Sequence, residues 1–212
     1  GLGDVYKRQI MYRPSVNFSK GNSNSGSFSE TLNNELIPIN QKEATNRQTN
    51  DRFSTNGSLQ FNRKLNSKGR NIALRLYYNL DNGNSDRYSL ANTYYLKYGD
   101  SIKVQNQWID NLNRNHEYRV QLTYMEPVFT NHFIEINYSY QHRSSLSEKY
   151  AYDWNDLEDS YSQYPDTAQS DCYKNKYSIH QVGAFFRTIR TNYFYNIGIE
   201  IEPQQTTNQS YM

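Results

Sequence analysis

Aromatic side chains gather in one stretch of the second half of the chain, where they could bind a ligand. Tyrosine and tryptophan rings can stack on sugar faces or flat chelates, and ligand contacts concentrate on loops that a rigid scaffold carries. A second interpretation is an aromatic girdle at a lipid interface that continues into a loop. The candidate ligand-binding residues are Tyr150, Tyr152, Trp154, Tyr161 and Tyr164.

Carboxylates of the same stretch could bind Ca²⁺ through hard oxygen ligands. They lack the regular spacing and the glycine of a calcium loop, so a solvated external loop is the favoured interpretation. The histidines show no ligand spacing either, and we predict no metal site. The acidic residues are Asp153, Asp156, Glu158, Asp159, Asp166 and Asp171, and the histidines are His116, His132, His142 and His180.

Catalytic signatures are not apparent in the sequence. Serine and aspartate are plentiful, but no pattern sets a nucleophile beside a base, and no glycine-rich loop joins a strand to a helix. We therefore predict a protein without enzymatic activity and without a cofactor. An outer-membrane barrel enzyme is a remaining alternative, which would need a catalytic dyad near the loops.

The segments around these residues alternate between apolar and polar side chains. Every second residue is apolar from Tyr118 to Tyr124 and again from Ile134 to Tyr140. This period of two is typical of strands with one apolar face. The pattern returns in nearly every extended segment and predicts an all-β fold, an antiparallel up-and-down meander of about seven long strands. The polar face is predicted to line a lumen with Arg75, Arg119, Gln121, Glu135 and Asn137.

The predicted connections differ at the two ends of the strands. Short turns fall near residues 66, 126 and 188, whereas long polar excursions cover residues 20–55, 81–115 and 155–170. The first excursion can contain strand extensions, and the second can also be a tall hairpin that turns near residues 98–101. Short turns at one end and long loops at the other are typical of a transmembrane β-barrel, and we predict a partial barrel wall. A soluble or surface-exposed β-sandwich that binds glycans is the alternative, because sandwich strands alternate in the same way.

Composition supports an ordered chain with a thin apolar surface. Only 35% of the residues are hydrophobic and the mean hydropathy is -1.00, yet the chain has 21 tyrosines, and disordered chains are poor in aromatics. No apolar stretch is long enough for a membrane-spanning helix. The net charge of +2 does not indicate nucleic acid as a partner, and the single cysteine, Cys172, cannot form an internal disulfide.

Two stretches resemble a known family. Residues 57–79 contain a strand, a Lys68-Gly69-Arg70 turn and a second strand, and residues 124–138 begin with Tyr124, Glu126 and Pro127 before another strand. Both are similar to the outer-membrane β-barrel family of Bacteroidota, whose members resemble TonB-dependent receptors. The similarity covers residues 12–202. It implies a bacterial outer-membrane location, a barrel of about 22 strands around a plug domain, and import of a solute with energy passed through TonB.

The chain departs from that pattern. It shows no plug, no TonB-contacting segment and no terminal aromatic strand. We therefore predict a foreign or disordered N-terminal segment at 1–9, a partial outer-membrane barrel at 10–204 and a truncated tail at 205–212. The expected partners are outer-membrane lipid, the missing plug and barrel strands, TonB through the plug, and an unidentified solute. Alone, such a piece is expected neither to insert nor to transport, because unpaired strand edges are costly in lipid.

Overall fold

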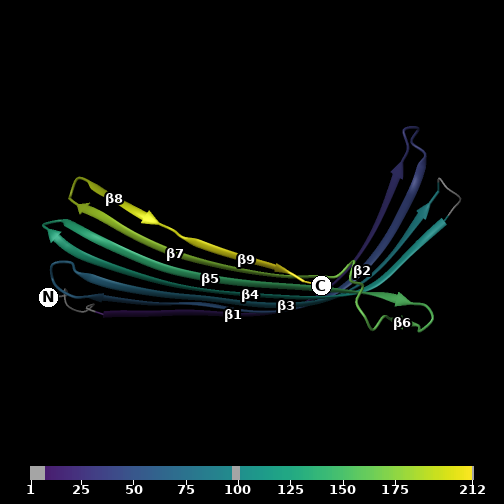
Figure 1. Ribbon diagram of the computed structural model, residues 1–212, viewed down its shortest axis with the longest axis horizontal. Helices are drawn as coiled ribbons and strands as arrows, with labels where there is room; N and C mark the ends of the chain where they lie inside the picture. Colours follow the sequence, from purple (N-terminus) through teal and green to yellow (C-terminus); the bar gives the residue numbers. More distant parts are fainter. Residues whose placement is uncertain (1–7, 97–100, 212) are drawn as a thin grey trace.

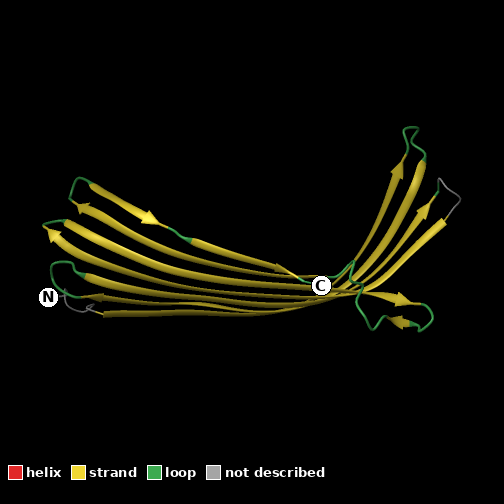
Figure 2. Cartoon of the chain, viewed as in Figure 1, coloured by secondary structure: helices red, strands yellow, loops and turns green. Residues whose placement is uncertain are grey.

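The computed structural model describes residues 8–96 and 101–211, which form strands and no helix (Figures 1 and 2). Part of the predicted segment 1–9 and most of the predicted turn at 98–101 lie outside these residues. No helix of the described residues is long and apolar enough to cross a membrane. The strands are β1 (Arg8–Leu32), β2 (Pro38–Lys64), β3 (Asn71–Tyr95), β4 (Ser101–Phe129), β5 (His132–Asn155), β6 (Ser160–Tyr161), β7 (Asp171–Ile189), β8 (Phe194–Ile201) and β9 (Gln204–Ser210).

The strands form one antiparallel sheet in the order β1-β2-β3-β4-β5-β7-β8. Strand β6 pairs with the end of β5, and β9 pairs with β7 beyond the end of β8. β8 and β9 share one register along β7 and are separated only by Glu202 and Pro203. The proline lacks the N–H that a continuous ladder needs. The predicted antiparallel meander of about seven strands is confirmed, and it is an open sheet with β1 at one edge.

Residues 20–55 do not form the long loop that was predicted, but the strand extensions allowed within that segment are present. β1 and β2 stay paired from Lys20 opposite Asp51 to Thr31 opposite Asn40, and only residues 33–37 connect them. Polar side chains on both faces removed the alternation that marks a half-buried strand, but they do not prevent backbone pairing. The segment at 81–115 is likewise a tall hairpin of β3 and β4. The loop predicted at 155–170 is confirmed, and β6 lies within it.

The short connections lie together at the opposite end of the sheet. β2 and β3 are joined at residues 65–70, where Gly69 has a φ of 106°, a left-handed conformation that favours glycine. β4 runs to Phe129 and β5 begins at His132, so the short turn predicted near residue 126 lies at residues 130–131. Asn131 there also has a positive φ, of 65°. The short turns thus form one end of the molecule, the turn end, and the long hairpins and the 155–170 loop form the other, the loop end.

The register keeps apolar residues on one face of all the long strands. Residues directly opposite one another form a row that crosses the sheet, and neighbouring rows repeat the pattern. We call the surface made by these rows the apolar band and the reverse side of the sheet the polar face. One row of the band is Ile10, Phe61, Leu74, Leu122, Tyr138, Val182 and Ile201.

The apolar band is not covered by other described residues. Ile134, Ile136 and Tyr138 are 39%, 49% and 38% exposed, and Ile199 is 75% exposed. The buried apolar side chains of the described residues are instead Ala91, Ile109, Ala151 and Cys172, all of which lie towards the loop end. There the tips of the β1–β2 and β3–β4 hairpins bend away from the rest of the sheet (Figure 1). The sheet is therefore a single layer held by strand pairing over most of its length.

Phe185 provides packing on the polar face near the turn end. Its ring lies over Gly183 and Gly198, so that a Cβ atom added to either glycine would overlap the ring. An added Cβ at Gly198 would also lie 2.5 Å from the carbonyl oxygen of Ala184. An aromatic ring that covers glycines of a sheet stabilises the pairing of their strands.

We predict that Gly198→Ala loosens the edge formed by β8. Overpacking of this kind costs roughly 1–3 kcal/mol, so the backbone amides of β8 should exchange with deuterium faster than in the unmodified chain. Gly21→Ala is the control, because no atom lies within 4 Å of a Cβ added there. Equal exchange of β8 in both variants would show that the Phe185 packing does not hold this edge.

Candidate functional site

An aromatic cluster lies at the loop end of the sheet. The register places Tyr88 of β3, Trp108 of β4 and Tyr152 of β5 directly opposite one another. The rings of Trp108 and Tyr152 are stacked, with centroids 4.7 Å apart and an interplanar angle of 21°. Stacked rings of this kind add to the stability that burial alone provides.

The 155–170 loop closes over this row through Tyr161. The Tyr161 ring stands edge-on to Trp154 at 5.1 Å and lies 5.8 Å from the ring of Tyr88. Its hydroxyl donates a hydrogen bond to Asn106 Oδ1 at 3.1 Å. Burial raises the pKa of Tyr161, and the nearby Tyr88 adds a smaller increase. The aromatic cluster therefore consists of Tyr88, Trp108, Tyr152, Trp154 and Tyr161.

Only three of the five candidate ligand-binding residues belong to the cluster: Tyr152, Trp154 and Tyr161. Tyr150 lies one row away and opposite Asp110, and its hydroxyl is 3.4 Å from the sulfur of Cys172. This hydrogen bond and burial raise the pKa of Tyr150 to about 12. Tyr164 is 80% exposed and makes no ring contact with the other described aromatics. The ligand-binding role of all five remains a prediction.

The candidate ligand-binding residues predicted from the sequence did not include Tyr88 and Trp108. Both lie in the segment that we interpreted as a polar excursion, and they are distant in sequence from the residues they meet. Their even numbers continue the parity of Tyr78 and Tyr118, and this parity predicts that they share a face with the apolar band if the segment is a tall hairpin, as the structure shows. On each strand, Tyr88 and Trp108 are ten residues nearer the loop end than Tyr78 and Tyr118. At 3.3 Å per residue this separation is roughly 33 Å along the strands. Tyr78 and Tyr118 are opposite one another and lie at the margin of the apolar band.

The loop is also fastened on the polar face. Gln169 Oε1 accepts hydrogen bonds from the amide nitrogens of Gln105 and Gln107, at 3.1 and 2.7 Å. Gln107 is only 4% exposed and donates a further bond of 2.7 Å to Asp153 Oδ1. The loop thus contacts both faces of β4, with Tyr161 on one face and Gln169 on the other. Asp153 and Asp166 serve as acceptors within this structure.

A pair of carboxylates borders the aromatic cluster. Asp86 of β3 lies directly opposite Asp110 of β4, and Asp86 Oδ1 accepts a hydrogen bond of 3.1 Å from the indole N–H of Trp108. Burial raises the pKa of Asp110, and the nearby charges of Asp86 and Glu148 raise it further. Within residues 8–96 and 101–211, no three His, Cys, Asp or Glu side chains are arranged to hold a metal ion.

The five residues predicted to line a lumen share the polar face. Arg75 lies opposite Gln121, and Arg119 donates a hydrogen bond of 2.9 Å to Gln141 Oε1. Near the turn end, Glu135 accepts a bond of 2.9 Å from Asn137 and forms an ion pair of 2.7 Å with Arg187. Buried polar groups need such partners, and this network supplies them to Glu135. The polar face is therefore hydrogen-bonded along the strands.

The histidines do not form a catalytic arrangement in the described part of the chain. His142 Nδ1 lies 2.9 Å from the hydroxyl oxygen of Ser178, and His132 Nδ1 lies 2.7 Å from that of Thr188. His180 Nδ1 is 3.1 Å from the hydroxyl of Tyr138. These are cross-strand pairs between β5 and β7, and no described carboxylate hydrogen-bonds to either His142 or His132 to complete a triad.

No protein-family model matches the chain, and no curated protein matches it. The resemblance to the outer-membrane β-barrel family therefore remains an expectation from the sequence. The geometry describes an open antiparallel sheet with one apolar side, one polar side and a structured loop end.

We predict that Asp110→Asn stabilises the loop end at neutral pH. A carboxyl whose pKa is raised by folding disfavours the folded state once it is ionised, and this penalty grows as pH rises from the unfolded pKa of about 3.9 through the higher folded value. The amide removes the charge. The increase in the free energy of unfolding caused by Asp110→Asn should therefore be complete at pH 7 and disappear below a pH of about 3.9.

Tryptophan fluorescence during urea unfolding measures this effect, because the only two tryptophans, Trp108 and Trp154, both lie in the aromatic cluster. Asp156→Asn is a suitable control, since Asp156 is an exposed acidic residue of the neighbouring loop. A gain from Asp110→Asn that is the same at low and neutral pH would contradict the charge explanation.

Proposed function

We propose that the chain forms part of the wall of an outer-membrane transport barrel, similar to TonB-dependent receptors, which imports a solute recognised by its extracellular loops. The observation that carries this proposal is the apolar band. It runs across all seven strand positions of the sheet and is left uncovered by the described residues. Lipid hydrocarbon is an environment in which such a surface is stable.

The height of the band supports a membrane location. On β3 the apolar residues of this face extend from Ile72 to Leu80, and on β5 from Ile134 to Tyr140. A tilted barrel strand needs about 9–11 residues to cross the hydrocarbon core. The strands themselves are much longer, up to 29 residues in β4. The remaining length therefore extends beyond the membrane at the loop end, where the surrounding side chains are polar.

The polar face supports a water-filled or plug-filled interior. Large barrels have polar interiors, and Arg75, Arg119 and Gln121 occupy the face that would turn inward. Closure requires further strands beside β1 and beside β8 and β9, because open edges are not tolerated in lipid. In this proposal those strands, a plug domain and TonB are the partners of the wall.

The loop end supports recognition of a solute. The 155–170 loop is fastened to both faces of β4, and it presents Tyr164 to solvent. Aromatic rings on a loop that is held in place are suited to stacking on a flat ligand.

The β-sandwich alternative requires a second packed sheet. The described residues form one layer, and Ile134, Ile136 and Tyr138 remain exposed in it. An enzyme would need a catalytic group near the loops, and the cross-strand histidine pairs described above do not suggest one. The barrel wall is thus the function that the arrangement of the two faces favours.

Adjacent residues on the two faces provide a test of this proposal. In the complete polypeptide that carries this sequence, reconstituted in vesicles, Ile136→Cys and Asn137→Cys would each be labelled with an environment-sensitive fluorophore in a Cys172→Ser background. We expect nitroxide-bearing lipids to quench the label at 136 and not the label at 137, because successive side chains of a strand point to opposite faces.

Aqueous iodide provides the complementary measurement. The label at 136 should be protected from iodide when the protein is in vesicles. If that label were open to iodide and unaffected by lipid nitroxide in a folded preparation, the barrel proposal would be wrong. Protection from both quenchers would instead favour burial beneath a second sheet.

A further inference from the structure

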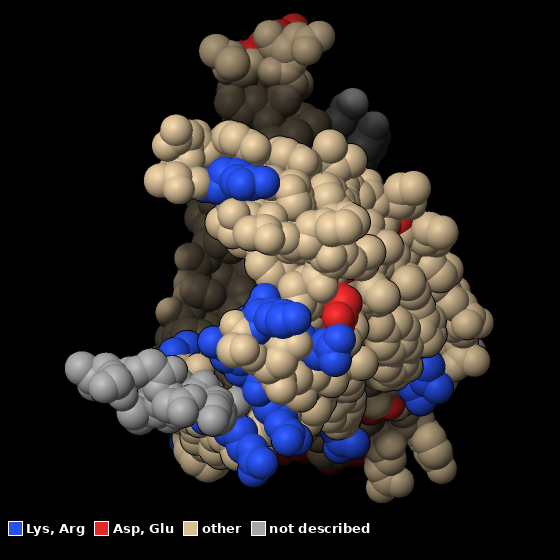
Figure 3. All heavy atoms as spheres, turned by 90° about the vertical axis from the view of Figure 1, so that its left-hand side faces the viewer, with Lys and Arg blue, Asp and Glu red and all other residues tan. Residues whose placement is uncertain are grey.

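Positive charge is concentrated at the turn end of the sheet. Figure 3 views this end directly and shows several lysine and arginine side chains, most of them in the lower half of the view, with few acidic ones. Residues 62–71, 125–135 and 185–198 contain six cationic side chains and only two carboxylates, Glu126 and Glu135. The cationic residues are Arg63, Lys64, Lys68, Arg70, Arg187 and Arg190.

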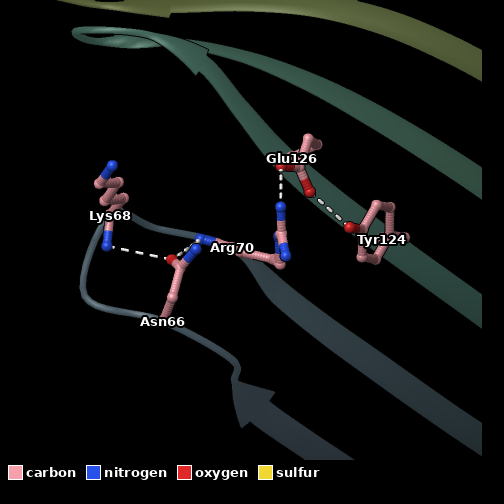
Figure 4. Close-up of polar contacts among 5 residues, drawn as sticks. All are labelled: Asn66, Lys68, Arg70, Tyr124 and Glu126. Atoms are coloured by element: carbon pink, nitrogen blue, oxygen red, sulfur yellow. Dashed lines mark hydrogen bonds and ion pairs between the residues drawn. The ribbon is translucent and has the colours of Figure 1, made fainter.

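Both carboxylates of this region already have partners. Glu126 forms an ion pair of 2.5 Å with Arg70 and accepts a hydrogen bond from the hydroxyl of Tyr124 (Figure 4). Glu135 pairs with Arg187 at 2.7 Å. Arg63 and Lys68 are exposed and form no ion pair with another described residue. Net positive charge therefore remains on the turn between β2 and β3.

The β2–β3 turn holds these cations in a defined place. Asn66 Oδ1 accepts hydrogen bonds from the backbone N–H groups of Lys68 and Arg70, at 3.0 and 2.9 Å (Figure 4). The backbone N–H of Leu65 donates to the carbonyl of Arg70 at 2.8 Å. Asparagine commonly stabilises turns in this way. The Lys68-Gly69-Arg70 motif thus forms a fixed turn from which two cationic side chains project.

Arg63 lies on the rim of the apolar band. It is opposite Ile72 and shares the face of Phe61, and Arg70 precedes Ile72 by two residues in the adjoining turn. Leu65, which follows on the same face, is 43% exposed. A guanidinium beside an apolar surface suits an amphiphile, because its charged group and its hydrocarbon can be bound together.

We infer that Arg63 and Lys68, with Arg70 beside them, bind the phosphate of an anionic phospholipid in the leaflet that faces the short turns. This inference rests on the proposed barrel function. The guanidinium of Arg63 can donate paired hydrogen bonds to phosphate oxygens, and Lys68 adds a point charge. The acyl chains would lie along the apolar band past Ile72 and Phe61. A free phosphate ion has no acyl chains that could contact the apolar band beside Arg63. We therefore assign the site to a lipid.

Lipid selectivity measured by electron paramagnetic resonance tests this inference. The complete polypeptide would be reconstituted in phosphatidylcholine vesicles containing a trace of spin-labelled phosphatidylglycerol or spin-labelled phosphatidylcholine. We expect a preference for phosphatidylglycerol in the motionally restricted lipid. The variant Arg63→Gln with Lys68→Gln should reduce that preference, by up to about fivefold for each cation removed at low salt.

A matched variant at the opposite end controls for total charge. Lys42→Gln with Lys103→Gln removes the same charge from exposed positions at the loop end and should leave the preference unchanged. Arg63→Lys should retain part of the preference, and added salt should weaken it.

The possible outcomes separate this inference from the function on which it rests. Motionally restricted lipid without any phosphatidylglycerol preference, or a preference that the Arg63→Gln/Lys68→Gln variant keeps, would overturn the lipid site and leave the barrel intact. The same is true if inorganic phosphate displaced the labelled phosphatidylglycerol at concentrations too low to screen charge, because the site would then recognise phosphate alone. Absence of restricted lipid of either kind would overturn the barrel proposal itself.

Discussion

The register of the strand ladder is the constraint on which the rest of this structure depends. Six successive antiparallel pairings keep the apolar residues of every strand on one face of the sheet, from Ile10 on β1 to Ile201 on β8. A slip of one residue in any pairing would turn a whole strand over and place charged side chains within the apolar band. The contrast between the two faces, and every functional statement built on it, follows from this register.

Much of the fold could be predicted because alternation is a local property. The segment 134–140 shows its two faces without knowledge of its neighbours, and it lies in a strand of the structure. The segment 20–55 does not show two different faces, because serine, asparagine and glycine occupy both sides of the strands there. Its pairing is determined by the partner strand and by continuation from the alternating region, neither of which leaves a hydrophobic signal. Polarity therefore indicated correctly that no core was present, but it did not show how far the two strands continue as a pair.

Less of the candidate site than of the fold could be predicted from the sequence. Tyr152, Trp154 and Tyr161 could be identified from their closeness along the chain, whereas Tyr88 and Trp108 join them only through the register of β3, β4 and β5. The same holds for Asp86 and Asp110, whose mutual repulsion depends on their being directly opposite. Contacts between residues distant in sequence require the pairing to be known. Local patterns thus predicted the scaffold and only part of what it brings together.

The break at Pro203 has a consequence for assembly. The backbone N–H of His180 donates to the Pro203 carbonyl at 3.0 Å, so this carbonyl points towards β7. The N–H and C=O of one strand residue point to the same side, and the donor that proline lacks is therefore missing on the side of β7. The opposite side keeps the donors of Glu202 and Gln204. This edge of the sheet can therefore pair with another strand, and the same free backbone donors would let it pair with foreign chains and aggregate.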